Sequence, residues 1–105
     1  MAATPLLLAL DQGTSSSRAA LFDTRGNPVA SASAPLAISY PADGWVEQSP
    51  SEIWESQRLA MERLAQSISP EQRGAVVACG VSNQRETTVL WRRSDGQPCG
   101  PALVW

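Results

Sequence analysis

The sequence predicts an α/β fold built on a mixed β-sheet, in a chain long enough for one domain at most. Two observations carry this prediction. Short apolar runs at 6–10 and 75–81 each open into a polar cluster, at 11–14 and 82–86, and the clearest helix signal, at 49–68, lies between them. Continuous apolar runs of this length are typical of strands buried on both faces of a sheet.

Three short strands are predicted before the helix. They cover residues 6–10, 18–22 and 29–36, and the turn formers at 24–28 separate the second from the third. The third strand alternates small apolar and hydroxyl side chains, so it is weakly amphipathic. Short strands joined by tight turns predict an antiparallel meander.

The helix follows a polar loop at 39–48. Ser49 is predicted to cap it, Pro50 to occupy its first position and Glu52 to bond back to the Ser49 amide, as in a capping box. A Ser-Pro pair at 69–70 ends it. We expect its apolar side chains to form one broad face that packs into the core, Trp54 included: Ile53, Trp54, Ala60, Met61, Leu64 and Ile68.

Beyond the strand at 75–81, a further strand is predicted at 87–91, a turn at Asp95-Gly96 and an apolar run at 102–105. The order β-β-β-α-β with a hairpin-like addition indicates a mixed sheet of the ribonuclease H-like kind. That fold needs more elements to cover both faces of its sheet. We therefore expect residues 1–105 to be a truncated N-terminal part of such a domain, with an open sheet edge and an uncovered apolar face.

The composition excludes several classes of protein. Hydrophobic residues make up 43% and charged residues 17%, which excludes disordered, collagen-like and coiled-coil chains. The net charge of −2 supplies no field that would draw the chain to nucleic acid or anionic lipid. The absence of Lys and His excludes lysine-based phosphate sites and Ser-His or Cys-His nucleophile pairs, and it argues against zinc.

Several features predict a cytoplasmic protein. No apolar run reaches the roughly 18 residues of a membrane span, and the first residues lack the basic region of a signal peptide. Cys79 and Cys99 are predicted to be free thiols in a reducing cytosol rather than a disulfide.

The polar turn after the first strand is a candidate phosphate site. Gly13 lets the backbone turn tightly and approach a ligand, and each of the four hydroxyls at 14–17 lies beside a backbone N–H that can donate to phosphate oxygens. Arg18 adds a planar cationic donor, and Asp11 can hold Mg²⁺ directly or through water. A plain polar hairpin turn is the alternative.

The second cluster, at 83–87, is a candidate polyol site. It lies past a strand end, where such sheets bind ligands, and Arg85 with Glu86 offers donors and acceptors to hydroxyl groups. A solvated charged turn is the alternative. The ring of Trp105 can pack on the carbons of a small polyol or simply in the core.

Together these segments resemble the glycerol kinases of the FGGY carbohydrate kinase family, whose domains share the architecture of actin, Hsp70 and hexokinase. The Asp-x-Gly-Thr and Gly-Trp-x-Glu motifs, at 11–14 and 44–47, also resemble related pentulose and hexulose kinases, whereas Asn-Gln-Arg-Glu-Thr-Thr at 83–88 discriminates glycerol kinases from them. The family has Thr more often than Ser at Ser15, which keeps the hydroxyl. The matching segments cover nearly the whole chain, in family order: 9–19, 44–48, Pro50 with 52–54, 80–88 and 104–105.

The resemblance implies an ATP-dependent kinase that converts glycerol to sn-glycerol 3-phosphate and releases ADP. It implies that Thr14, Ser15 and Ser16 contact the nucleotide phosphates and that Arg18 lies near the phosphate being transferred. It places Asp11 near Mg²⁺.

The resemblance also implies that Arg85 and Glu86 bind glycerol hydroxyls and that Trp105 packs on the glycerol carbons. The family's general-base aspartate, adenine pocket and second domain lie beyond Trp105. Because phosphoryl transfer depends on positioning and charge stabilisation, we expect activity from the intact protein, as a homo-oligomer, and none from residues 1–105 alone.

Three alternatives stay open. In the first, the intact protein is a kinase for another polyol or ketose. In the second, the chain is a non-catalytic, actin-like nucleotide-binding module. In the third, the chain is a folding fragment that dimerises by strand exchange over its open edge.

Overall fold

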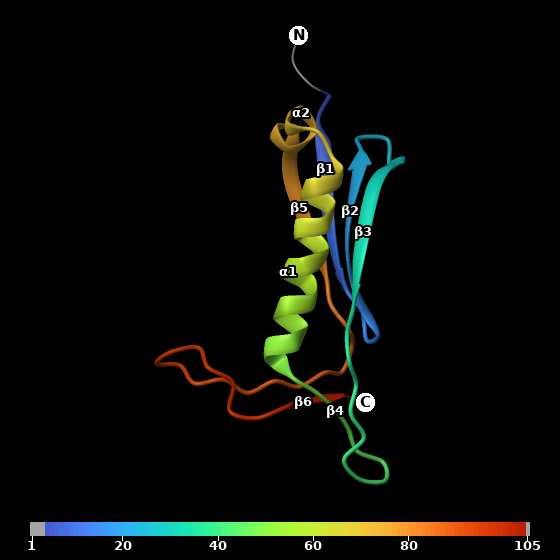
Figure 1. The fold of residues 1–105 in the computed structure, drawn as a ribbon. Coiled ribbons are helices and arrows are strands. Elements are labelled where there is room, and N and C mark those ends of the chain that lie inside the picture. Colours follow the sequence, from blue (N-terminus) through green and yellow to red (C-terminus); the bar gives the residue numbers. More distant parts are fainter. Residues whose placement is uncertain (1–3, 105) are drawn as a thin grey trace.

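The computed structural model describes residues 4–104, which form a mixed sheet with one long helix on one face and a small second sheet at one end (Figure 1). The four-stranded sheet has the order β3-β2-β1-β5. Its strands are β1 (Leu6–Gln12), β2 (Ser16–Asp23), β3 (Pro28–Pro35) and β5 (Val76–Ser82). The second sheet pairs β4 (Val46–Gln48) with β6 (Ala102–Val104), and the helices are α1 (Pro50–Ser67) and α2 (Pro70–Gly74).

The predicted meander and the mixed sheet are both confirmed. Strand β2 pairs antiparallel with β1 on one side and with β3 on the other. After α1 the chain returns as β5, which pairs in parallel with β1 and brings Asp11 opposite Ser82. Because parallel neighbours end at the same sheet edge, the polar clusters that follow β1 and β5 lie side by side.

The core lies between α1 and the sheet face that this helix covers. Leu6, Leu21 and Leu64 supply its larger buried side chains, and Ala19 and Ala60 are fully buried between helix and sheet. Alanines at these facing positions let α1 pack closely on β2 and β3.

Helix α1 begins as predicted, but its capping box is only half formed. The Ser49 hydroxyl accepts the Glu52 N–H at 3.3 Å, and Pro50 occupies the first turn. Within the described chain the Glu52 carboxylate makes no bond back to the Ser49 amide. A complete capping box instead starts α2, which the sequence patterns did not predict: Ser69 and Gln72 each accept the other's backbone N–H.

Two predictions of burial are wrong. Strand β5 is an exposed edge strand, since 66% of Val77 and 75% of Val81 is accessible. Trp54, predicted in the core, is 58% exposed. Both follow from the position of α1, which packs mainly on β3 and β2 and leaves the β5 side uncovered among residues 4–104. The expected open edge and uncovered apolar face are present in this part of the chain.

The strand predicted at 87–91 does not form as a regular element in the described chain. Thr88 exchanges two backbone bonds of 2.9 Å with Leu103, and Trp91 forms an isolated bridge with Pro98. The loop between Thr88 and β6 projects from the main body (Figure 1). It closes at the predicted turn, where Gly96 has a φ of 73°. A hairpin with so little surface to pack against does not hold a regular ladder.

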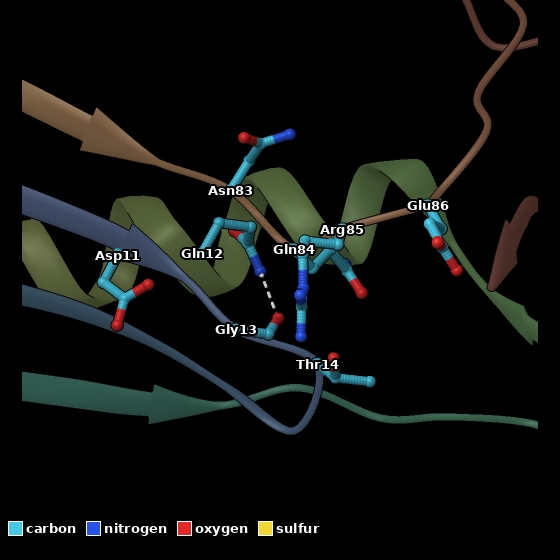
Figure 2. Close-up of a pocket in the computed structure, with 8 residues that line it drawn as sticks. All are labelled: Asp11, Gln12, Gly13, Thr14, Asn83, Gln84, Arg85 and Glu86. Carbon is cyan, nitrogen blue, oxygen red and sulfur yellow. Dashed lines mark hydrogen bonds between the residues drawn. The ribbon is translucent and has the colours of Figure 1, made fainter. Parts of the chain in front are cut away.

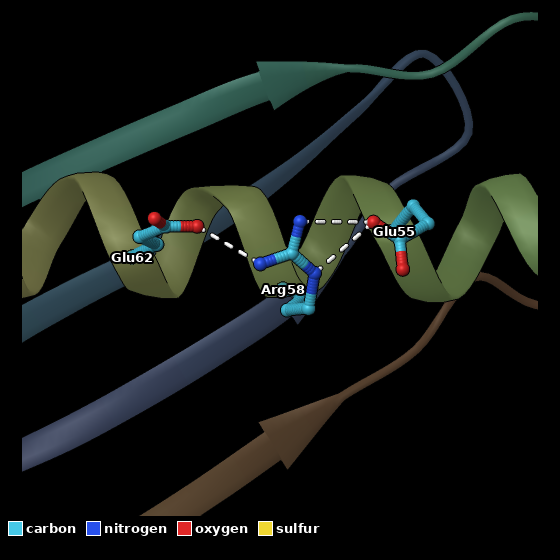
Figure 3. Close-up of polar contacts among 3 residues, drawn as sticks. All are labelled: Glu55, Arg58 and Glu62. Carbon is cyan, nitrogen blue, oxygen red and sulfur yellow. Dashed lines mark hydrogen bonds and ion pairs between the residues drawn. The ribbon is translucent and has the colours of Figure 1, made fainter.

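An ion-paired triad lies on the solvent side of α1 (Figure 3). Arg58 bonds to Glu55 at 3.0 Å and to Glu62 at 2.9 Å. Hydrogen bonding and charge from Glu55, and then from Glu62, raise the pKa of Arg58. Because the three side chains are about half exposed, the pairs are screened by water and support the helix only weakly.

The carboxylate of Asp23 organises the turn between β2 and β3. It accepts the backbone N–H groups of Arg25 and Asn27, both at 2.9 Å, and the Asn27 amide at 3.1 Å. The Asn27 backbone bond is the main cause of a pKa for Asp23 below the ordinary 3.8. A lowered folded-state pKa means that the charged carboxylate stabilises the fold above pH 3.8, and that this contribution is lost as pH falls through the lowered pKa.

We therefore expect Asp23→Asn to lower the melting temperature at neutral pH by an amount that stays constant down to about pH 5 and then shrinks between about pH 5 and about pH 2. Thermal unfolding of the wild-type and Asp23→Asn proteins, followed by circular dichroism, measures this difference in melting temperature at each pH. A difference that stays constant down to about pH 2 would contradict the role of the charged carboxylate.

Candidate functional site

A pocket of ≈ 490 Å³ lies where β1 and β5 end. Figure 2 shows its two sides, one made by the turn after β1 and the other by the segment after β5. Its lining residues are Asp11, Gln12, Gly13, Thr14, Asn83, Gln84, Arg85 and Glu86. Both polar clusters that the sequence singled out therefore line one cavity, because β1 and β5 are parallel neighbours.

The turn after β1 is tight, and its tightness requires Gly13. The Gly13 N–H donates to the Ser16 carbonyl at 2.9 Å. A Cβ atom on Gly13 would lie 2.8 Å from that same carbonyl oxygen, closer than side chains tolerate. The Ser15 carbonyl accepts the Leu36 N–H at 3.0 Å, which ties the turn to the end of β3.

Three of the four hydroxyls in this turn are free to meet a ligand. Those of Thr14, Ser15 and Ser16 make no hydrogen bond within residues 4–104, whereas Ser17 is fully buried and donates to Gln12 Oε1 at 3.1 Å. Gln12 in turn donates to the Gly13 carbonyl at 3.0 Å. The turn thus presents a short run of unengaged donors on a fixed backbone, as a phosphate site needs.

Asp11 and Arg18 are opposite each other in the pairing of β1 with β2, so their side chains share one face of the sheet. Both are exposed, and they form no ion pair in the described part of the chain. No cluster of three or more His, Cys, Asp or Glu side chains that could hold a metal lies within residues 4–104. A single carboxylate beside a phosphate-type turn still fits Mg²⁺, which is bound by one or two carboxylates with substrate phosphates and water.

On the other side of the pocket, Arg85 and Glu86 lie on an exposed segment without regular structure. Glu86 has a φ of 58°, the only non-glycine residue of the described chain with a positive φ. A left-handed residue with a Cβ costs about 1 kcal/mol and is typical of ligand sites. Gln84, next to Arg85, donates to Gln48 Oε1 at 2.9 Å, and Gln48 Nε2 donates to the Thr14 carbonyl at 2.6 Å.

The structure gathers some of the predicted site residues and separates others. Four of them line the pocket: Asp11, Thr14, Arg85 and Glu86. Three lie on the adjoining turn and strand, outside the lining: Ser15, Ser16 and Arg18. Trp105 lies outside the described residues. Sequence reasoning missed Gln48, which belongs to the resembling segment at 44–48 but has no local signal of a role.

An antiparallel meander with a phosphate-type turn after its first strand, joined through a helix to a strand parallel to that first strand, is the arrangement of a ribonuclease H-like domain. Residues 6–105 match the family model described as "FGGY family of carbohydrate kinases, N-terminal domain". The chain belongs to the FGGY family of carbohydrate kinases.

Curated relatives and solved structures agree with this family. The chain is 56% identical over 99 residues to a glycerol kinase of Verminephrobacter eiseniae, covering 94% of this chain and 19% of the relative. It is 47% identical over 105 residues to a glycerol kinase of Rhodospirillum centenum, covering 100% and 21%. The chain thus spans about a fifth of the length of the curated relatives it matches.

Among solved structures, a xyloylose kinase from Brucella ovis superposes with a TM-score of 0.88 at 33% identity, covering 95% of this chain and 21% of that one. Plasmodium falciparum glycerol kinase with ADP gives 0.83 at 27% identity, covering 97% and 20%. In residues 4–104 no helix is long and apolar enough to cross a membrane. Cys79 and Cys99 form no disulfide within the described residues, and both are exposed, although the sequence predicts a buried strand at Cys79.

Proposed function

We propose that residues 1–105 are a partial N-terminal domain of a glycerol kinase, which transfers the terminal phosphate of ATP to glycerol and yields sn-glycerol 3-phosphate and ADP. The observation that carries this proposal is the shared pocket, in which the turn after β1 faces the Arg85-Glu86 segment. The curated relatives at 47–56% identity that are named glycerol kinases support the choice of substrate.

The nucleotide phosphates occupy the turn side of this pocket. The free hydroxyls of Thr14, Ser15 and Ser16 donate to phosphate oxygens, and Gly13 keeps the turn closed enough to present them together. Arg18 stabilises the negative charge that develops during transfer. Asp11 would hold Mg²⁺, which, when bound, neutralises charge on the transferred phosphate.

Glycerol occupies the Arg85-Glu86 side. The Arg85 guanidinium donates to hydroxyl oxygens and the Glu86 carboxylate accepts hydroxyl protons, so the pair recognises adjacent hydroxyl groups. The ring of Trp105 packs on the glycerol carbons. A kinase for another polyol or ketose remains the alternative, because the Brucella ovis structure, named a xyloylose kinase, has the same fold.

We place the general base that accepts the proton of the attacking hydroxyl outside residues 1–105, as the family resemblance implies. Positioning supplies most of the rate enhancement in phosphoryl transfer, and half a cleft supplies little positioning. The exposed, free thiols of Cys79 and Cys99 fit a reducing cytoplasm, in which we place a homo-oligomeric enzyme. For the 105-residue chain alone, the open β5 edge keeps the strand-exchanged dimer as an alternative.

We expect Mg²⁺- and ATP-dependent phosphorylation of glycerol from the complete protein and none from the 105-residue chain. An assay coupled to ADP release measures both, with xylulose and ribitol as alternative acceptors and Asp11→Ala as the matched inactive variant. Turnover by the purified chain that Asp11→Ala abolishes would overturn the prediction of inactivity. Phosphorylation of a ketose but not of glycerol would select the alternative kinase.

A further inference from the structure

Gln48 is a buried residue whose side chain contacts both halves of the pocket without lining it. Only 3% of Gln48 is exposed. Its Nε2 donates to the Thr14 carbonyl at 2.6 Å, and its Oε1 accepts a bond from Gln84 Nε2 at 2.9 Å. One carboxamide therefore joins the turn after β1 to the segment after β5.

The backbone of Gln48 is held on both sides, so its carboxamide is a fixed reference point. Gln48 ends β4 and pairs with Ala102 of β6, which is fully buried. The next residue, Ser49, caps α1. A strand pairing and a helix start thus fix the position from which the side chain reaches the pocket.

The two partners of Gln48 each precede functional groups. Thr14 follows Gly13, so holding the Thr14 carbonyl sets the orientation of the free hydroxyls in the turn. Gln84 precedes Arg85 and the left-handed Glu86, so holding its side chain sets the start of the hydroxyl-binding segment. The other amide atom of Gln84, Oε1, is buried without a partner in residues 4–104. Within residues 4–104, the hydrogen bond to Gln48 is therefore what holds the Gln84 side chain in place.

We infer that Gln48 is a positioning residue that couples the nucleotide turn to the polyol segment, so that one side chain sets the geometry of both. The identity of the two ligands rests on the proposed function. The coupling itself rests on the two hydrogen bonds and on the burial of Gln48.

Gln48→Met in the complete protein tests this coupling, because methionine keeps the length and loses both the donor and the acceptor. We expect kcat/KM to fall about tenfold or more for glycerol and for ATP, since leaving buried polar partners unpaired weakens each side. We also expect the tightening of glycerol binding by a non-hydrolysable ATP analogue, measured by calorimetry, to fall towards no effect. Adding Gln84→Met to Gln48→Met should lower kcat/KM and the binding coupling little further, because both substitutions remove the same Gln48–Gln84 hydrogen bond.

Ser56→Ala is the matched control. The Ser56 hydroxyl is also buried and bonds to carbonyls on a neighbouring strand, those of Ala34 and Pro35, but it lies away from the pocket. Its loss should leave both KM values and the binding coupling unchanged. If Gln48→Met fails to fold, Gln84→Met alone breaks the link while leaving the Gln48–Thr14 bond in place.

Hydrogen exchange followed by mass spectrometry separates this inference from the proposed function. Gln48→Met should speed exchange in segments 13–17 and 83–87 together, and Ser56→Ala in neither. Faster exchange in one segment only, or in neither, would overturn the coupling. A wild-type protein that does not phosphorylate glycerol would refute the proposed function, while the exchange result would still decide the role of Gln48.

Discussion

Replacing Gly13 with valine should lower kcat/KM for ATP by about 100-fold or more in the complete protein, because a displacement of about 1 Å at a reacting site can have that effect. Any Cβ at this position would lie 2.8 Å from the Ser16 carbonyl oxygen. That oxygen belongs to the backbone and accepts the Gly13 N–H, so it cannot move away without opening the turn. Under the proposed function, an opened turn would move the hydroxyls of Thr14 and Ser15 away from the phosphate oxygens that they bind.

Steady-state kinetics and nucleotide binding by calorimetry measure this effect. Gly74→Ala is the control, since a Cβ there meets no atom within 4 Å and Gly74 precedes β5 at the end opposite the pocket. Gly13→Ala should lower kcat/KM for ATP less than Gly13→Val does, because the alanine side chain is smaller and displaces the turn less. Wild-type kinetics in both Gly13 variants would show that the closure of the turn is irrelevant to nucleotide binding.

The fold was predictable wherever local signals were strong. The meander came from short apolar runs and turn formers, and α1 came from its cap at Ser49 and from its periodicity. Burial was less predictable, because an apolar pattern does not say which element will cover it. Trp54, on α1, and Val81, on β5, have core-type sequences but are exposed, and both line an apolar hollow on the β5 side that nothing in residues 4–104 covers.

Strand β4 could not be predicted, because its three residues form a strand only through pairing with β6 near the other end of the described chain. The same non-local pairing places Gln48, so its bridging role was invisible in the sequence. Ser17 illustrates a different limit. Strand β2 begins at Ser16, and the alternation of its side chains turns Ser17 inward with Ala19, which removes one of the four predicted phosphate donors.

The site itself was largely predictable, because its two halves follow the ends of two strands. Each polar cluster comes directly after an apolar run, and a helix between the runs favours a parallel pairing. Parallel neighbours bring Asp11 and Ser82 to the same edge, so the clusters had to meet if β1 and β5 were adjacent. Adjacency was the step that only the structure supplied.

Glu86 carries the second large expected effect, on glycerol rather than on ATP. Glu86→Gln keeps the size of the side chain but replaces a charged acceptor with a neutral amide. A hydrogen bond to a charged group contributes about 1.5–3 kcal/mol, so KM for glycerol should rise about 10- to 100-fold while KM for ATP changes less than about twofold. Glu71→Gln, on α2, is the control and should leave both KM values unchanged.

Glu86→Gly separates binding from backbone strain. Glycine adopts a φ of 58° freely, so this substitution should stabilise the fold, by up to about 1 kcal/mol, while it removes the carboxylate. Urea unfolding and glycerol kinetics should therefore change in opposite directions: a more stable protein with a much higher KM for glycerol. A residue kept in a strained conformation for ligand binding gives this pattern. If Glu86→Gly is less stable and binds glycerol normally, the left-handed conformation serves the loop and not the site.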